Sequence, residues 1–416
     1  MATLGQRVTR LERTVATLEG TMATLDERIA ALQAVDLNHE TRIVALEQLV
    51  LPPPLPPAGQ AIIMSTTGND ANPGTEIAPV ATVGRLAELM RAGVRTGLIR
   101  GGVYPQSMED MDWPVGTSWA DPVLISAYPG EPVTFRPDMS ASRVLHVSFP
   151  KEFIEFRGFE CDAINAAGPL GGHECIKLAG CRAIRLRQIV ALDPLSQGIS
   201  AQASDVLGSG FHEFLDCRSY RAGIRNPAPD NEKHGFYIAV PDCLVSGGES
   251  IGHLDWGLQL FNGDQSRCLV ERMLLQDNGA GGLVVDAADD AVIRKMLILG
   301  GTSGRNIHPD GTSGRAGVLV GSGNLVRRVM IDLVVVLQSG TGINLQPFHS
   351  ENARVTNSRI TQGLYPSPWD GPINNAGVGT TFGGNSVDKA MNASYTDGDP
   401  TAIVDPSPAY TDPRGL

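Results

Sequence analysis

Five acidic and histidine side chains near the middle of the chain are the best candidates for catalytic chemistry. They are Asp230, Glu232, His234, His253 and Asp255. Carboxylates and histidines take up and release protons, and carboxylates also bind cations. If one turn of a coil separates the last two residues from the first three, the two groups stack about 5 Å apart. The sequence offers an acid/base pair or a cation site here, or, alternatively, loop residues that are polar because water surrounds them.

A second acidic cluster gives less reason to expect a site. Its members are Asp286, Asp289, Asp290, His308 and Asp310. No segment matches a calcium-repeat consensus, while Asp277-Asn278-Gly279 and Asp264 have the residue types of turns. The six cysteines form no zinc-binding pattern. We therefore expect no metal site and no cofactor.

Other signatures of catalysis are weak. The sequence contains no GxSxG, P-loop or HExxH motif. Only 5% of the residues are aromatic, so few side chains can stack on sugar rings. We therefore lean towards a protein without enzymatic activity and leave a polysaccharide lyase or glycosidase as the open alternative.

Two series of short apolar strands recur and indicate a solenoid. The first series covers 235–238, 257–260, 282–285, 317–320 and 342–345, at spacings of 22, 25, 35 and 25 residues. The second covers 243–245, 268–270, 291–293, 325–327 and 353–355. Two interleaved series with one period predict coils that stack strand on strand. Residues 300–315 and 226–232 interrupt the period and should project as loops.

The cysteines fit this register. Cys181, Cys243 and Cys268 hold corresponding places in successive expected strands, and Cys217 is placed with them. A stack of small apolar thiols suits a narrow core. We expect reduced, buried cysteines rather than disulfides.

The stretch from Ile62 to Tyr104 carries a succession of motifs. A strand and a Gly-Asn-Asp/Pro-Gly-Thr loop occupy residues 62–75, Pro79-Val80-Ala81-Thr82 precedes an amphipathic stretch over 84–92, and a strand follows at 97–104. This succession resembles the N-terminal cap and first coil of the pectate-lyase-like superfamily, although Val80 stands where an aromatic residue is usual. The resemblance implies an all-β fold, a right-handed parallel β-helix, over residues 61–365.

This resemblance does not imply one reaction, because the superfamily includes polysaccharide lyases, hydrolases and phage tailspikes. Its lyases need a Lys, Arg or His base, often with calcium, and its hydrolases need two carboxylates. As an enzyme of either kind, the chain would use the cluster between residues 230 and 255.

The first fifty residues have the heptad pattern of a coiled coil. Apolar residues alternate at intervals of four and three from Leu4 to Leu32, and the register resumes at Ile43. β-Branched residues at a and Leu at d favour a dimer, but two segments match the Arg-apolar-apolar-Glu pattern of short trimeric coiled coils. We predict a parallel trimer. Its specifying residues are Arg7, Leu11, Glu12, Ile29, Leu32, Arg42, Ile43, Leu46 and Glu47.

Asp36 and His39 fall on the seam of this coiled coil, where an unpaired charge is costly. They form either a loosened layer that fixes the register or an ion-binding, pH-sensitive layer.

Composition divides the chain into four parts. We expect a trimerisation stalk over 1–50, a proline-rich linker over 51–60, the β-helix over 61–365 and a loop-rich cap or tail over 366–416. No run approaches the roughly 20 apolar residues that cross a bilayer, and no signal peptide precedes the heptads. The net charge of −12 argues against nucleic acid or an anionic membrane as a partner.

A coiled-coil stalk, a proline spacer and a β-helix together resemble bacteriophage spikes and fibres. The resemblance implies a homotrimeric structural protein of the virion surface, on the tail or the capsid, assembled in the host cytoplasm. Such a protein decorates the particle or binds host-surface glycan, and its stalk contacts other virion proteins. The alternative is a polysaccharide depolymerase on the same fold.

Overall fold

The structure is a computed structural model of the full chain. It describes residues 60–168, 173–203, 208–225, 233–263, 265–300, 316–339, 341–346, 348–362, 373–375, 377–387, 403–404 and 414. The predicted stalk, with its trimerisation residues, Asp36 and His39, lies outside the described residues. Asp230, Glu232, Asp264, His308 and Asp310 lie outside them as well.

The amphipathic stretch near the start of the body is a helix, as predicted. It is α2 (Val83–Arg91), and the Thr82 side chain caps it by accepting a hydrogen bond from the Arg85 amide at 3.2 Å. Its apolar face buries Leu86 and Met90, which lie against Gly97, where a β-carbon would come within 2.8 Å of the Met90 sulfur. The helix therefore covers the first coil.

One sheet has ten parallel strands among the described residues, which follow one another in chain order. These strands are β4 (Met108–Glu109), β7 (Leu145–Ser148), β10 (Ile176–Ala179), β13 (Ile199–Gln202), β15 (Phe236–Ala239), β17 (Trp256–Leu260), β20 (Gly281–Val285), β23 (Ala316–Val320), β27 (Thr341–Leu345) and β31 (Ile373–Asn375).

A second sheet has 22 strands within the described ranges and consists of two arms. The first arm contains β1 (Ile62–Met64), β2 (Thr96–Ile99), β5 (Val123–Ala127), β8 (Glu152–Arg157), β11 (Arg182–Arg187), β14 (Glu213–Tyr220), β16 (Leu244–Ile251), β18 (Leu269–Glu271), β21 (Val292–Arg294), β25 (Met330–Asp332), β29 (Arg354–Thr356) and β32 (Thr381–Gly383). The second arm shares β14 and β16, which run through both arms. Its other strands are β3 (Gly102–Tyr104), β6 (Val133–Phe135), β9 (Glu160–Asp162), β12 (Val190–Leu192), β19 (Leu274–Gln276), β22 (Leu297–Leu299), β26 (Val335–Ser339), β30 (Arg359–Gln362), β33 (Ser386–Val387) and β34 (Ile403–Val404).

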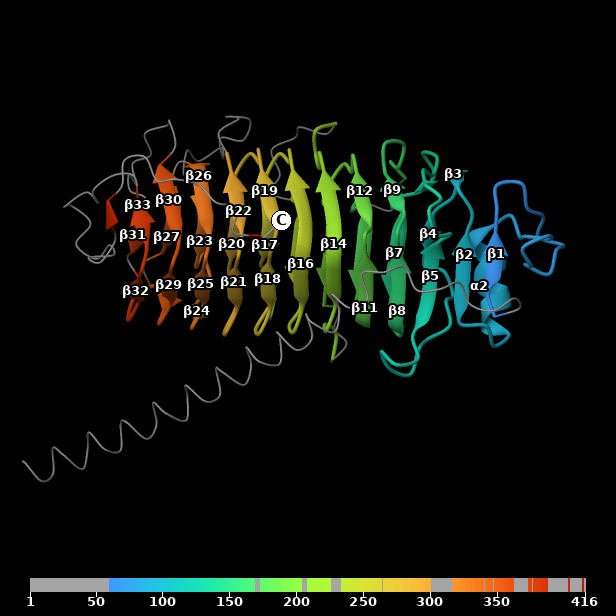
Figure 1. The fold of residues 1–416 in the computed structure, drawn as a ribbon, viewed down its shortest axis with the longest axis horizontal. Coiled ribbons are helices and arrows are strands. Elements are labelled where there is room, and N and C mark those ends of the chain that lie inside the picture. Colours follow the sequence, from blue (N-terminus) through green and yellow to red (C-terminus); the bar gives the residue numbers. More distant parts are fainter. Residues whose placement is uncertain are drawn as a thin grey trace, which may run out of the picture. The chain divides into compact units, whose positions relative to one another are not determined.

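Each coil takes one strand from the ten-stranded sheet, one from the first arm and one from the second. Thus β7, β8 and β9 form one coil, and β10, β11 and β12 pair with them in parallel in the next. Figure 1 shows the coils stacked in chain order from α2 to β33. The body is a parallel β-helix, as the strand periodicity predicted, and β31 to β34 continue it into the segment expected to be a cap or tail.

The first predicted strand series is confirmed residue for residue. Phe236 pairs with Leu258, Leu258 with Leu283, Leu283 with Val318, and Val318 with Ile343. In the second series one member is wrong, because Met330 rather than Val326 lies opposite Val292. The connection after β23 is longer than in the preceding coil, and its middle forms β24 (Val326–Arg327), which pairs with β28 (Ser350–Glu351).

The predicted cysteine stack is only partly correct. Cys243 and Cys268 are neighbours in register, but the same place in the preceding coil belongs to His212. Cys181 and Cys217 lie at other levels, because the connections before β11 and β14 differ in length from those that follow. All six cysteines are buried and unpaired, as expected.

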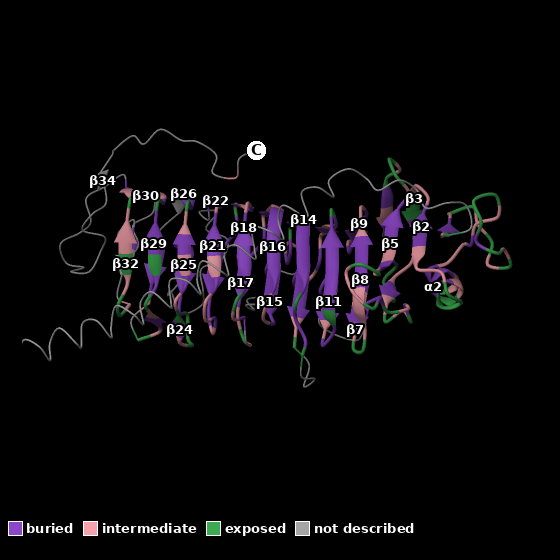
Figure 2. Cartoon of the chain, turned by 60° about the horizontal axis from the view of Figure 1, so that its bottom comes forward, coloured by how far each residue is buried: buried purple, intermediate pink, exposed green. Residues whose placement is uncertain are grey.

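Inward side chains of the three strand series form one core. Phe214, Phe236 and Leu258 have no exposed surface, and residues that alternate with them along the strands point outward. Figure 2 shows buried residues following the strands and exposed ones gathering at the turns. Among the described residues, no helix is both long and apolar enough to cross a membrane.

The corner between the two arms is made by one residue of left-handed backbone conformation per coil. The corner column consists of Gly158, Gln188, Asp216, Gly247, Arg272, Lys295, Leu333, Asn357 and Gly384, with φ between 50° and 76°. Left-handed backbone costs about 1–2 kcal/mol for most L residues, and least for Gly, Asn and Asp. The sharp turn between the arms therefore imposes a small, repeated cost.

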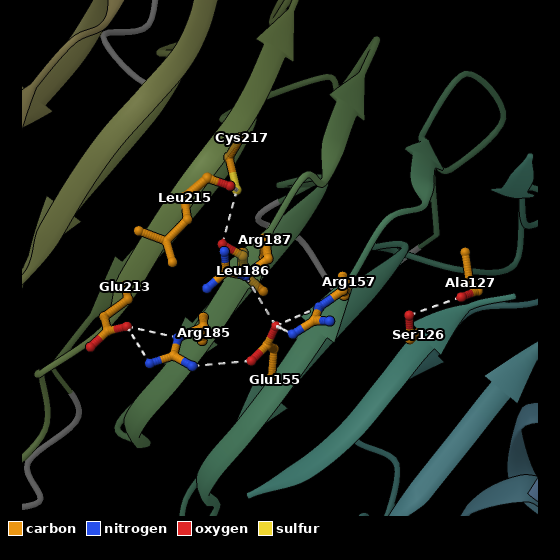
Figure 3. Close-up of polar contacts among 10 residues, drawn as sticks. All are labelled: Ser126, Ala127, Glu155, Arg157, Arg185, Leu186, Arg187, Glu213, Leu215 and Cys217. Carbon is orange, nitrogen blue, oxygen red and sulfur yellow. Dashed lines mark hydrogen bonds and ion pairs between the residues drawn. The ribbon is translucent and has the colours of Figure 1, made fainter. Parts of the chain in front are cut away.

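A network of charged side chains lies on the outer face of the first arm (Figure 3). Glu155 accepts hydrogen bonds from Arg157 at 2.7 Å, Arg185 at 3.1 Å and Arg187 at 3.2 Å. Arg185 also bonds Glu213 at 2.7 Å, so the network joins three coils. Burial raises the pKa of Glu155, but the three arginines outweigh burial and hold that pKa below its usual value.

Candidate functional site

The outer face of the ten-stranded sheet carries a row of polar side chains, one from each of six neighbouring strands. This outer polar row consists of Glu109, His146, Lys177, Ser200, Tyr237 and Gln259, which register as direct neighbours. The residues beside them in their strands, such as Leu145 and Val147, belong to the core. The row therefore runs along the axis of the β-helix with one side chain about every 4.8 Å.

His234 and Asp255, both predicted site residues, meet beside this row. His234 Nδ1 lies 3.3 Å from Asp255 Oδ2, and both side chains are nearly fully buried. The imidazole stacks on Tyr237 with ring centroids 5.8 Å apart and planes 13° apart. A carboxylate against one ring nitrogen is the arrangement that orients a histidine for proton transfer.

His253 is placed differently, because the backbone of the preceding coil uses both of its ring nitrogens. Nδ1 accepts a hydrogen bond from the Ala222 amide at 2.9 Å, and Nε2 donates to the Ser219 carbonyl at 3.1 Å. Burial lowers the pKa of His253 to about 3, so the ring is neutral at physiological pH. It connects two coils and offers no ring nitrogen as a base.

Asp230 and Glu232, the other two predicted residues, lie outside the described residues, so the structure brings together His234 and Asp255 alone from the predicted five. Within the described ranges, no three His, Cys, Asp or Glu side chains converge as the ligands of a metal ion would.

The second acidic cluster serves the connections between coils. Asp286 accepts hydrogen bonds from the amides of Gly323 and Asn324 at 2.9 and 2.8 Å, which fixes the turn after β23. Asp290 pairs with Arg328 through contacts of 2.6 and 2.8 Å. These carboxylates thus have structural partners.

Three residues that the sequence did not single out form an ion-paired group around Lys177, the third residue of the row. Glu174 is buried and contacts Arg143 and Lys177, each at 2.8 Å. Burial raises the pKa of Glu174, but Lys177 and Arg143 outweigh burial and keep the pKa below its usual value. The carboxylate holds both cations in place on the outer face.

His146 is held by a carboxylate as well. Its Nδ1 lies 3.0 Å from Asp110 Oδ2, and Asp110 also accepts a hydrogen bond from Ser148 at 2.8 Å. Burial lowers the pKa of His146 and the cations of Arg143 and Lys177 lower it further, against the opposing effect of Asp110. The ring is therefore neutral near pH 7, with Nδ1 as its donor.

A signal for these residues is present in the sequence. Leu145-His146-Val147 and Ile176-Lys177-Leu178 each place a basic residue between two apolar ones, which marks an outward position on a strand. The strand series began at residue 235, so the earlier coils were not aligned with it.

Solved structures with the same architecture were found by comparison. A protein named XylC, solved with xylose, superposes with a TM-score of 0.54 at 11% identity over 83% of this chain and 86% of its own. The Dettilon tailspike protein superposes with a TM-score of 0.53 at 11% identity over 79% of this chain and 62% of its own. An alginate lyase from Paenibacillus sp. str. FPU-7 gives 0.50 at 13% identity, over 70% and 96%.

These solved structures share the parallel β-helix fold of this chain. No family model matches the chain, and no curated protein matches it. At identities of 11–13% the likeness is one of fold. A lyase and a tailspike protein occur among these structures, so the activity has to be inferred from the side chains of this chain.

Proposed function

We propose that this chain is a subunit of a trimeric spike or fibre on the surface of a bacteriophage, on the tail or the capsid, where it decorates the particle or binds host-surface glycan. The observation that carries the proposal is the outer polar row. It places polar side chains at a regular interval along a rigid β-helix, of which Glu109, His146 and Lys177 are partly exposed, and such polar groups fix the orientation of a bound ligand.

The residues near the row favour binding over cleavage. Both ring nitrogens of His253 are used by the backbone, and Lys177 and Arg143 are held by Glu174. These contacts position side chains rigidly, which suits recognition. They leave His234 and Asp255 as the one carboxylate–histidine pair from the predicted cluster.

The predicted stalk completes the proposal. Heptads over residues 1–50 would hold three bodies together, and three weak glycan contacts add to an avidity far above that of one. Contact between the stalk and other virion proteins would attach the trimer to the particle.

Mass and location test this proposal. Light scattering should give three times the 44.1 kDa of one chain, and antibody-labelled electron microscopy should place the chain on the surface of the phage particle. A monomer in solution, or particles that carry no label, would contradict it.

The alternative, a polysaccharide depolymerase, is favoured by one observation, the 3.3 Å contact between His234 and Asp255. Purified chain would be incubated with host-surface polysaccharide, and new reducing ends or absorbance from unsaturated uronate would be recorded. Release that is lost in His234→Asn and Asp255→Asn but kept in His253→Asn would establish the enzyme. The absence of release from the wild-type chain would remove it.

A further inference from the structure

An apolar stripe lies on the outer face of the second arm. This second-arm stripe consists of Leu274, Leu297, Leu299, Val335 and Leu337, which are neighbours in register on β19, β22 and β26. The residues that alternate with them, Leu275, Ile298 and Val336, point into the core. Figure 1 shows the three strands side by side along the arm. The stripe therefore belongs to the outside of the β-helix.

Two members of the stripe are buried although they point outward. Leu297 is 3% exposed and Val335 is 6% exposed, while the other three are half-buried. A side chain on an open face of a sheet keeps part of its surface in contact with water. These exposures are those of one chain by itself, so the cover over the stripe comes from the same chain.

The polypeptide leaves the β-helix from this arm. Val335 pairs with Arg359, Arg359 with Ser386, and Ser386 with Ile403 of β34. Ile403 is therefore three strand spacings, or about 14 Å, from the stripe. Residues 405–416 begin beside it.

The composition of residues 405–416 suits an extended path along the arm. Pro406, Pro408 and Pro413 favour an extended chain of about 3.1 Å per residue. β22 lies four strand spacings, or about 19 Å, from β34, so about six extended residues reach it. The sixth residue after Val404 is Tyr410, which has the segment's largest apolar surface.

Charged residues at both ends of this path agree with it. Arg359, between the stripe and β34, is half-buried and has an interaction partner, and Asp405 brings the opposite charge directly after β34. Arg414 is also half-buried with an interaction partner, and it belongs to the same compact unit as the β-helix. The far end of the segment therefore packs against other residues.

We propose that residues 405–416 form a strap that runs back along the second arm and covers the second-arm stripe of its own chain, with Tyr410 packed on Leu297 and Leu299. The strap removes apolar surface from water and fastens the last coils to earlier ones. Copies in the proposed trimer then meet through other faces. The strap itself does not depend on the proposed function.

Paired cysteines in the full-length chain test the path. Leu299→Cys with Ala409→Cys should form a disulfide within one chain on mild oxidation, and the six native cysteines are buried. Leu192→Cys with Ala409→Cys is the matched control, since Leu192 is half-buried and faces outward on β12 of the same arm. β12 lies about 38 Å from β34, whereas five residues span at most about 18 Å.

Non-reducing gels and mass spectrometry of peptides identify the links. We expect a link between positions 299 and 409 within one chain and none between 192 and 409. A link between two chains would show that the segment covers a neighbouring copy and would overturn the proposal. Equal linkage in both variants, or none in either, would overturn it as well.

Removal of the Tyr410 ring tests the cover independently. Tyr410→Ser should lower the melting temperature by about 2 °C or more and increase the fluorescence of a dye that binds apolar surface, because the stripe becomes exposed. Thr411→Ser, in the same segment, should change neither. Wild-type dye fluorescence in Tyr410→Ser would overturn the packing of Tyr410 on the stripe.

Discussion

His253 and Asn278 occupy the same corner in successive coils, since Ile251 pairs with Gln276. The Asn278 side chain accepts a hydrogen bond from the His253 amide at 3.2 Å and donates to the Ser250 carbonyl at 3.0 Å. His253 makes the same two kinds of bond to the coil before it. The imidazole of His253 therefore makes the same two kinds of hydrogen bond that the Asn278 amide makes one coil later.

Substitution of His253 tests that role. His253→Asn should keep the free energy of unfolding within about 1 kcal/mol of wild type, because an amide can make both bonds. His253→Leu should lose about 2–4 kcal/mol, since two buried backbone groups would lose their partners. Urea denaturation at pH 7 measures both changes. Equal destabilisation by the two variants would contradict the role.

The pH dependence of stability follows from the same burial. Burial lowers the pKa values of His212 and His253 to about 3, against 6.5 in the unfolded chain. Their contribution is fully present above pH 6.5 and is lost as the pH falls towards 3, because the unfolded state takes up protons first. Each histidine contributes a slope of about 1.4 kcal/mol per pH unit in this window. The slope should be smaller by that amount in His253→Asn, and an unchanged slope would count against neutral, buried His253.

The site was predictable from the sequence only in part. The spacing between His234 and Asp255 correctly predicted that the two side chains lie close together, because residues one period apart stack in adjacent coils. The same spacing could not reveal that a corner turns His253 towards the backbone. Glu174, His146 and Lys177 were missed because their strands precede the repeat from which the register was read.

At the scale of elements, some charged side chains on the outer face of the parallel strands are buried. Ion pairs with neighbouring strands stabilise these charges. On the first arm, Glu155 is shared by Arg157, Arg185 and Arg187, and its side chain is 3% exposed. Removing one member of such a buried group is costly, because the others lose their counter-charge in a poorly solvated place.

Neutralising that carboxylate should therefore weaken the β-helix. Glu155→Gln is expected to lower the free energy of unfolding by about 3–5 kcal/mol, measured by denaturant titration. Glu88→Gln is the control, because Glu88 pairs with Arg85 on an exposed helix surface and should cost less than about 0.5 kcal/mol. Similar small losses in the two variants would show that the network contributes little.

The corner column offers a stabilising substitution. Leu333 has φ of 51° and an exposed side chain, so it bears the left-handed cost without a packing benefit. Leu333→Asn should raise the free energy of unfolding by about 1 kcal/mol. Val103→Asn, on the exposed face of β3, should give no such gain. A loss of stability in Leu333→Asn, seen as a lower melting temperature, would contradict this account of the corner.

Much of the element pattern was predictable because strands of the ten-stranded sheet from β15 to β27 have a glycine next to their first residue, at intervals of 22, 25, 35 and 25 residues. The second arm was not predicted, since its three-residue strands follow the first arm after two residues and carry little periodic signal. Val326 was assigned to the wrong strand for a related reason. A longer connection can hold a short apolar run that resembles the strand beyond it.

At the scale of the whole molecule, the β-helix supplies a long, regular surface and the predicted stalk supplies a means of holding several copies together. A net charge of −12 per chain disfavours anionic partners for the proposed spike. Binding without cleavage is the behaviour expected of a structural spike.

If the proposed function holds, the chain binds host-surface glycan and leaves it intact. Host-surface polysaccharide would be fixed to a mass-sensitive surface, exposed to the full-length chain and then washed with guanidinium chloride to unfold and remove the protein. The account predicts a rise in mass during exposure, followed by return to the original mass of polysaccharide. A final mass below the original, abolished in His234→Asn, would contradict it.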